Sequence, residues 1–77
     1  MNYTMEQAKQ MFNVAYLTDF RIDRSLDNEW IISLGKGMSE GFLIDARNKK
    51  VRTFKSLDSA VKTLESVGFS IDALFRG

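Results

Sequence analysis

The sequence contains no cysteine, no histidine and no proline. Without cysteine the chain cannot form a disulfide, and without cysteine or histidine it lacks the usual protein ligands of zinc and haem. A carboxylate site for a hard cation would need a dense cluster of acids, whereas the 10 acidic residues are scattered singly. We therefore predict a fold that is stabilised by apolar packing and holds no metal and no small-molecule cofactor.

The same absences remove the commonest catalytic groups. Histidine is the most frequent general base and cysteine is the strongest common nucleophile. Residues 37–41 have the Gly-x-Ser-x-Gly spacing around Ser39, but a nucleophile elbow joins a strand to a helix, whereas this stretch is expected to join two strands, and the chain has no histidine to activate the serine. Residues 35–37, Gly-Lys-Gly, resemble a fragment of a phosphate-binding loop, but a P-loop joins a strand to a helix and this stretch is expected to join two strands. The sequence thus predicts a binding protein and not an enzyme.

Long apolar runs are missing as well. The N-terminus lacks the basic region and following apolar run of a signal peptide. No apolar stretch approaches the roughly 20 residues that a membrane-spanning helix needs. The absence of cysteine also fits a reducing compartment. We expect a cytoplasmic protein that has no membrane partner.

The residues that are present suit one small folded unit. With 77 residues the chain is long enough for a single core, so we predict one domain over residues 1–77. Apolar residues make up 44% of the chain and aromatic residues 12%, which argues against disorder. Because so small a core gives modest stability, self-association is a natural way to add to it.

Two amphipathic helices are predicted. Thr4 is a suitable N-cap, and Gln7 three residues later completes a capping box for a helix over about residues 5–14. Ser56 is a suitable N-cap for the second helix, which Gly68 is placed to end. The apolar stripe of this second helix consists of Leu57, Ala60, Val61, Leu64 and Val67.

Alternating apolar and polar residues predict strands over 18–24, 29–34 and 41–46, and a short fourth strand over 51–54. A glycine-rich loop joins the second strand to the third. Together with the helices, this order predicts an α+β fold with the arrangement α-β-β-β-(β)-α. We expect a two-layer sandwich in which an antiparallel sheet of three to four strands carries two helices on one face.

The face opposite the predicted core bears on function. The alternation places there Arg21, Asp23, Ile31, Ser33, Leu43, Asp45 and Arg52. If Ile31 and Leu43 are exposed side by side, they suit a dimer seam, and otherwise a second element covers them. The tail over 70–77 is either a helical turn or a strand, and its Leu74 and Phe75 would join such a seam. One hypothesis is therefore a protein-interaction module that acts as a homodimer.

Charge supports a different hypothesis. The net charge is only +1, from 11 basic and 10 acidic residues, so binding of nucleic acid requires local segregation of charge. Residues 47–55 carry five basic residues and no acid, namely Arg47, Lys49, Lys50, Arg52 and Lys55. This stretch is either a phosphate-contact surface or a solvated turn that protects a strand edge. In the first interpretation, Arg21 reaches a base edge from the sheet.

Two resemblances bear on this choice. Residues 45–60, a basic strand followed by a capped helix, resemble the last strand and helix start of three-stranded-sheet DNA-binding modules, such as the arm-binding domains of tyrosine integrases and AP2-type domains. Five stretches that together span most of the chain are similar to small plasmid- and phage-associated replication regulatory proteins of the RepB type. These stretches are 17–21, 30–32, 41–47, 54–61 and 64–69.

The second resemblance implies control of replication initiation, through DNA or through the initiator protein, and it assigns no individual residues. The α-β-β-β-α order is also that of double-stranded RNA-binding domains. Those domains carry lysine at the start of the last helix, where this chain has Ser56, Leu57 and Asp58. We therefore expect a DNA-binding regulator of replication, with a homodimeric interaction module or a double-stranded RNA-binding module as the alternatives.

Overall fold

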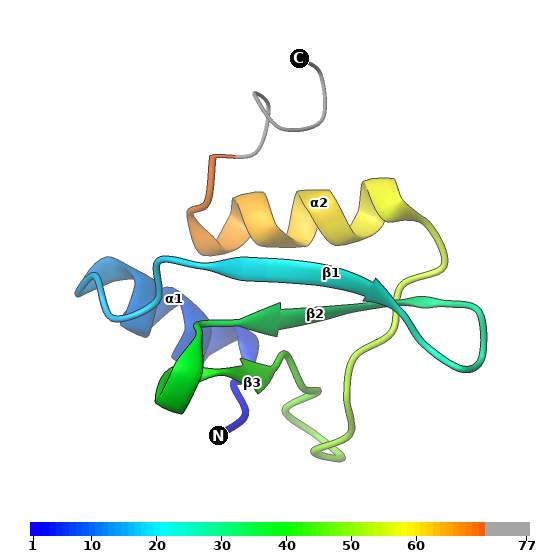
Figure 1. Ribbon diagram of the computed structural model, residues 1–77, viewed down its shortest axis with the longest axis horizontal. Helices are drawn as coiled ribbons and strands as arrows, with labels where there is room; N and C mark the ends of the chain where they lie inside the picture. Colours follow the sequence, from blue (N-terminus) through cyan, green and yellow to red (C-terminus); the bar gives the residue numbers. More distant parts are fainter. Residues whose placement is uncertain (71–77) are drawn as a thin grey trace.

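The computed structural model describes residues 1–70, and the predicted structure of the tail beyond them, with Leu74 and Phe75, lies outside the described residues. Along the chain, one helix precedes and one helix follows a three-stranded sheet that has a short 3-10 turn between its last two strands (Figure 1). In chain order the elements are α1 (Met5–Asn13), β1 (Phe20–Arg24), β2 (Trp30–Leu34), η1 (Gly37–Ser39), β3 (Gly41–Phe42) and α2 (Leu57–Val67).

The sheet is antiparallel with the order β1-β2-β3, and α1 and α2 cover the same face of it (Figure 1). This arrangement confirms the predicted α+β class and the two-layer architecture. Arg21 of β1 pairs with Ser33 of β2, which pairs with Phe42 of β3, so these three side chains form a row on the face without helices, the open face.

Both predicted helix starts are confirmed. The Thr4 hydroxyl accepts the Gln7 backbone N–H, and the Gln7 side chain accepts the Thr4 N–H, which is the predicted capping box. The Ser56 hydroxyl accepts the Ser59 N–H at the start of α2. Gly68 ends α2 with φ +135°, and the Phe12 ring lies so close that a methyl group on Gly68 would meet it at 2.6 Å. The closing glycine therefore also lets the two helices approach each other.

The last two strands are shorter than predicted. The third strand covers only Gly41 and Phe42, and the predicted fourth strand is reduced to two isolated bridges, Ile44 with Val51 and Trp30 with Phe54. The same edge of β2 pairs with β3 near its end and with the segment around Phe54 at its start. Its end pairs with β3, and its first residue, Trp30, exchanges two 2.8 Å backbone hydrogen bonds with Phe54.

The core lies between the sheet and the helices and corrects one prediction. Leu43, expected on the open face as part of a dimer seam, is 1% exposed and belongs to the core. Because Phe42 pairs with Ser33, Phe42 takes the open face, and the next residue must point to the helices. Alternation within a strand gives two faces but does not say which one is buried, and Phe42 and Leu43 are both apolar.

The N-terminal residues form a contact that the sequence did not predict. Tyr3 pairs in parallel with Leu43, donating its N–H to Phe42 O at 2.9 Å and accepting the Ile44 N–H at 2.7 Å. The chain runs so close to Gly41 that a Cβ there would lie 1.2 Å from Met1 O. Residues 1–3 thus cover the outer edge of β3.

Candidate nucleic-acid interface

The turn that leads into the basic residues is organised by one acidic side chain. The Asp45 carboxylate accepts the backbone N–H of Arg47 at 2.7 Å and that of Asn48 at 3.4 Å. Backbone hydrogen bonds join Asp45 to Lys49 at 2.9 Å and to Lys50 at 2.8 Å. The Asn48 side chain in turn accepts the Lys50 N–H at 2.9 Å. These contacts give the Lys49–Lys50 pair a defined backbone at the tip of a loop.

We call residues 47–55 the basic segment, and its cations face solvent. Arg47, Lys49, Lys50 and Lys55 are exposed, and Arg52 is half-buried with its guanidinium 5.3 Å from the centre of the Phe54 ring. The ion pairs among residues 1–70 join Arg21 to Asp23, Arg21 to Glu40 and Lys62 to Asp58. None of these pairs involves a cation of the basic segment, so its positive charge is open to an external anion.

Two acids nevertheless border the segment. Asp45 and Glu6 line a hollow of about 490 Å³ together with Arg47 and Arg52, between the start of α1 and the turn. The Arg47 and Asn48 N–H groups, followed by the positive charges of Arg52 and Arg47, lower the pKa of Asp45 below its ordinary value. Asp45 is therefore ionised at neutral pH, so two cations and two anions line this hollow, whereas Lys49, Lys50 and Lys55 of the basic segment lie outside its lining. The surface keeps a positive excess.

The two acids of α2, Asp58 and Glu65, do not neutralise the positive charge of the basic segment. Asp58 pairs with Lys62 at 3.4 Å, one turn further along the same helix. Lys62 is therefore partnered within α2 and adds little to the basic segment. Glu65 is exposed on the second half of α2, away from the helix start that follows Lys55.

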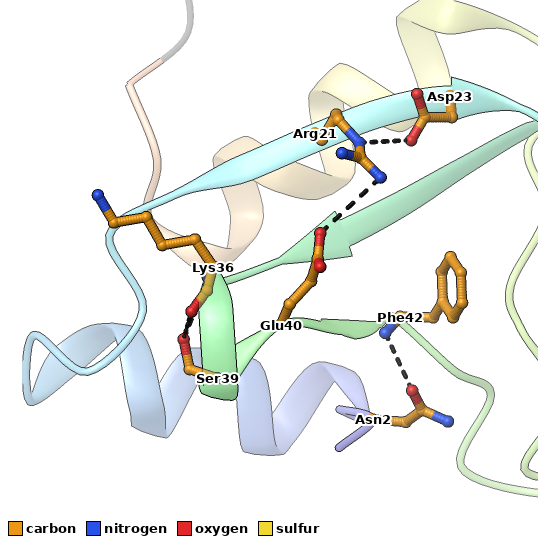
Figure 2. A network of polar contacts seen from close by, with 7 residues as sticks. All are labelled: Asn2, Arg21, Asp23, Lys36, Ser39, Glu40 and Phe42. Atoms are coloured by element: carbon orange, nitrogen blue, oxygen red, sulfur yellow. Dashed lines mark hydrogen bonds and ion pairs between the residues drawn. The ribbon is translucent and has the colours of Figure 1, made fainter.

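The structure does not bring Arg21 together with the other predicted site residues. Figure 2 shows Arg21 on the open face, with its Nε 2.8 Å from Asp23 Oδ2 and its Nη2 3.8 Å from Glu40 Oε2. The hydrogen bond to Asp23, followed by the charges of Asp23 and Glu40, raises the pKa of Arg21. Two acids thus surround this guanidinium, whereas the basic segment contacts the opposite end of β2 through Phe54.

The open face around Arg21 has its own shape. Arg21, Glu40 and Phe42 line a hollow of about 310 Å³ whose floor includes the buried Ser33. The Asn2 side chain closes one side of it by accepting the Phe42 N–H at 3.0 Å (Figure 2). The charges here are mixed, with one cation and two acids in contact, so this hollow lacks the electrostatics of a phosphate site.

Arg24 is a further exposed cation that the distribution of charge along the sequence does not single out. Arg24 ends β1, and its guanidinium lies 4.5 Å from the centre of the Trp30 ring. In the sequence Asp27 and Glu29 follow closely, so the region looks neutral. Strand pairing brings Arg24 close to the basic segment, because Trp30 pairs with Arg24 on one side and with Phe54 on the other.

Within residues 1–70, no cluster of three His, Cys, Asp or Glu side chains is arranged to hold a metal ion. The helices in this part of the chain are all too short or too polar to cross a membrane. No protein-family model, curated protein or solved structure matches the chain.

Proposed function

We propose that this protein binds the phosphate backbone of DNA through the basic segment and acts as a small non-catalytic regulator. The observation that carries the proposal is the set of five cations on an ordered turn and its continuation, none of them in an ion pair within residues 1–70. Phosphate contacts supply most of the affinity of sequence-independent DNA binding. A surface of this kind fits that task without a catalytic group.

The biological setting in this proposal follows from the resemblance to RepB-type proteins. That resemblance supports a role for the binding in the control of replication of a plasmid or phage-like element. An 8.8 kDa protein of this kind acts by occupying DNA near an origin or by contacting the initiator there. The charge argument supports the DNA contact, and the resemblance supplies the process.

The test is a titration of labelled duplex DNA by fluorescence anisotropy at about 50 and 200 mM salt. Five phosphate contacts predict a slope of about −4.5 in log K against log salt, hence a loss of roughly 500-fold over this fourfold range. The double variant Lys49→Ala with Lys50→Ala should bind at least about tenfold more weakly and lower the slope by about 1.8.

The matched control is Lys9→Ala with Lys36→Ala, which removes the same charge from exposed positions in α1 and in the β2–β3 loop. This control should keep most of the affinity. Equal losses in the two double variants, or no binding by the unmodified protein at the lower salt, would exclude the proposed surface. Tighter binding to duplex RNA of the same length would assign the surface to RNA.

A further inference from the structure

The β1–β2 hairpin and the end of the basic segment lie side by side. Trp30, the first residue of β2, is paired on one edge with Arg24 of β1 and on the other with Phe54. Figure 1 shows the hairpin loop and the chain leading into α2 at the same end of the molecule. Adjacent strands are about 4.8 Å apart, so Arg24 and Phe54 are separated by about two such steps.

Residues paired across a sheet point to the same face, so Arg24, Trp30 and Phe54 form one row across the end of the sheet. A guanidinium covers each of the two aromatic rings of this row. Arg24 lies 4.5 Å from the Trp30 ring centre, and Arg52 lies 5.3 Å from the Phe54 ring centre. The two neighbouring rings therefore each hold one arginine, Arg24 of the hairpin over Trp30 and Arg52 of the basic segment over Phe54.

Arg24 is held in place but is not neutralised. Its guanidinium donates to the Asn28 side-chain oxygen, which carries no charge. Asp27 and Glu29 belong to the same hairpin, and within residues 1–70 neither forms an ion pair with Arg24. Arg21, three residues earlier on the same strand, lies between two acids instead.

We infer that Arg24, and not Arg21, is the sixth cation of the DNA-contacting surface, a role that rests on the function proposed above. The Trp30 ring and the Asn28 side chain limit the rotamers of Arg24 before DNA arrives, which reduces the entropy lost on forming a phosphate contact. The surface then runs from the turn at residues 47–50, along the segment to Lys55, and across the sheet end to the hairpin.

The experiment compares Arg24→Ala with Arg21→Ala in the same anisotropy titration of duplex DNA. Loss of one phosphate contact lowers the slope of log K against log salt by about 0.9. The loss of affinity over a fourfold rise in salt then becomes about 3.5-fold smaller. We expect this change for Arg24→Ala and none for Arg21→Ala. Arg24→Lys should restore the slope, since it keeps the charge, whereas a merely structural role would not give this pattern.

Trp30 provides a second readout, because it is the only tryptophan in the chain. DNA should change its emission in the unmodified protein, and it should change it less in Arg24→Ala at saturating DNA. If Lys49→Ala with Lys50→Ala lowers the slope but Arg24→Ala does not, and Trp30 emission is unaffected by DNA, the role of Arg24 is wrong while the proposed function stands. If neither variant lowers the slope, both fail together.

Discussion

Leu43 joins the core, the basic segment and the central strand. Its side chain is buried, its N–H donates to Ile32 O at 3.0 Å, and its carbonyl accepts the Arg52 N–H at 2.9 Å. A residue with these contacts contributes to the stability of the folded chain and also holds the basic segment against the sheet at Arg52. It has no surface left for a second molecule.

Leu43→Ala should therefore lower the free energy of unfolding by about 2–5 kcal/mol, as truncation of a fully buried leucine does. Denaturant unfolding measures this loss. The matched control is Leu26→Ala, since Leu26 is fully exposed at the tip of the β1–β2 hairpin and should change stability by less than about 0.5 kcal/mol. A stable Leu43→Ala variant that has lost self-association would restore the dimer-seam interpretation.

At the scale of elements, the turn before the basic segment depends on an ionised carboxylate. Asp45 has a folded pKa below its unfolded value, chiefly because the Arg47 N–H bonds to the charged form. The stability that ionised Asp45 gives to the folded turn is therefore fully present above the unfolded pKa, near pH 4, and is lost as the pH falls through the lower folded pKa. The order of the turn should follow this titration.

NMR spectra recorded between about pH 6 and 2.5 test this dependence, since the Arg47 and Asn48 amide shifts should move together as Asp45 is protonated. Asp45→Asn removes the titrating group while keeping a side-chain oxygen, so these shifts should lose that transition. Amide shifts that move with the same midpoint in the Asn variant would contradict the role of Asp45.

The sequence predicts the helices of this protein better than its strands, and the reason is the range of the interactions. The caps at Thr4 and Ser56 join residues three apart, so local spacing reveals them. Where β3 ends, and whether residues 51–54 form a strand, depend on which segment pairs with each part of the β2 edge. That choice is made by residues far apart in the chain, including Tyr3, and no local pattern contains it.

At the scale of the whole molecule, a near-neutral chain separates its charges. The open face combines Arg21 with Asp23 and Glu40, while the cations at the other end of β2 are free of ion pairs within residues 1–70. Five of these cations are neighbours in the sequence and were predicted as a group. Arg24 joins them only through the pairing of three chain segments, so the sequence alone could not place it there.

This separation of charge makes the account testable in a single NMR titration of the isotope-labelled protein with duplex DNA at about 50 mM salt. Amide shifts should change at residues 24–30 and 45–55 and should reverse when salt is raised to about 300 mM, because phosphate contacts weaken with salt. The amides of Arg21, Ser33 and Phe42 on the open face should stay in place. Shifts confined to the open face, or none at the lower salt, would contradict DNA binding by the basic segment.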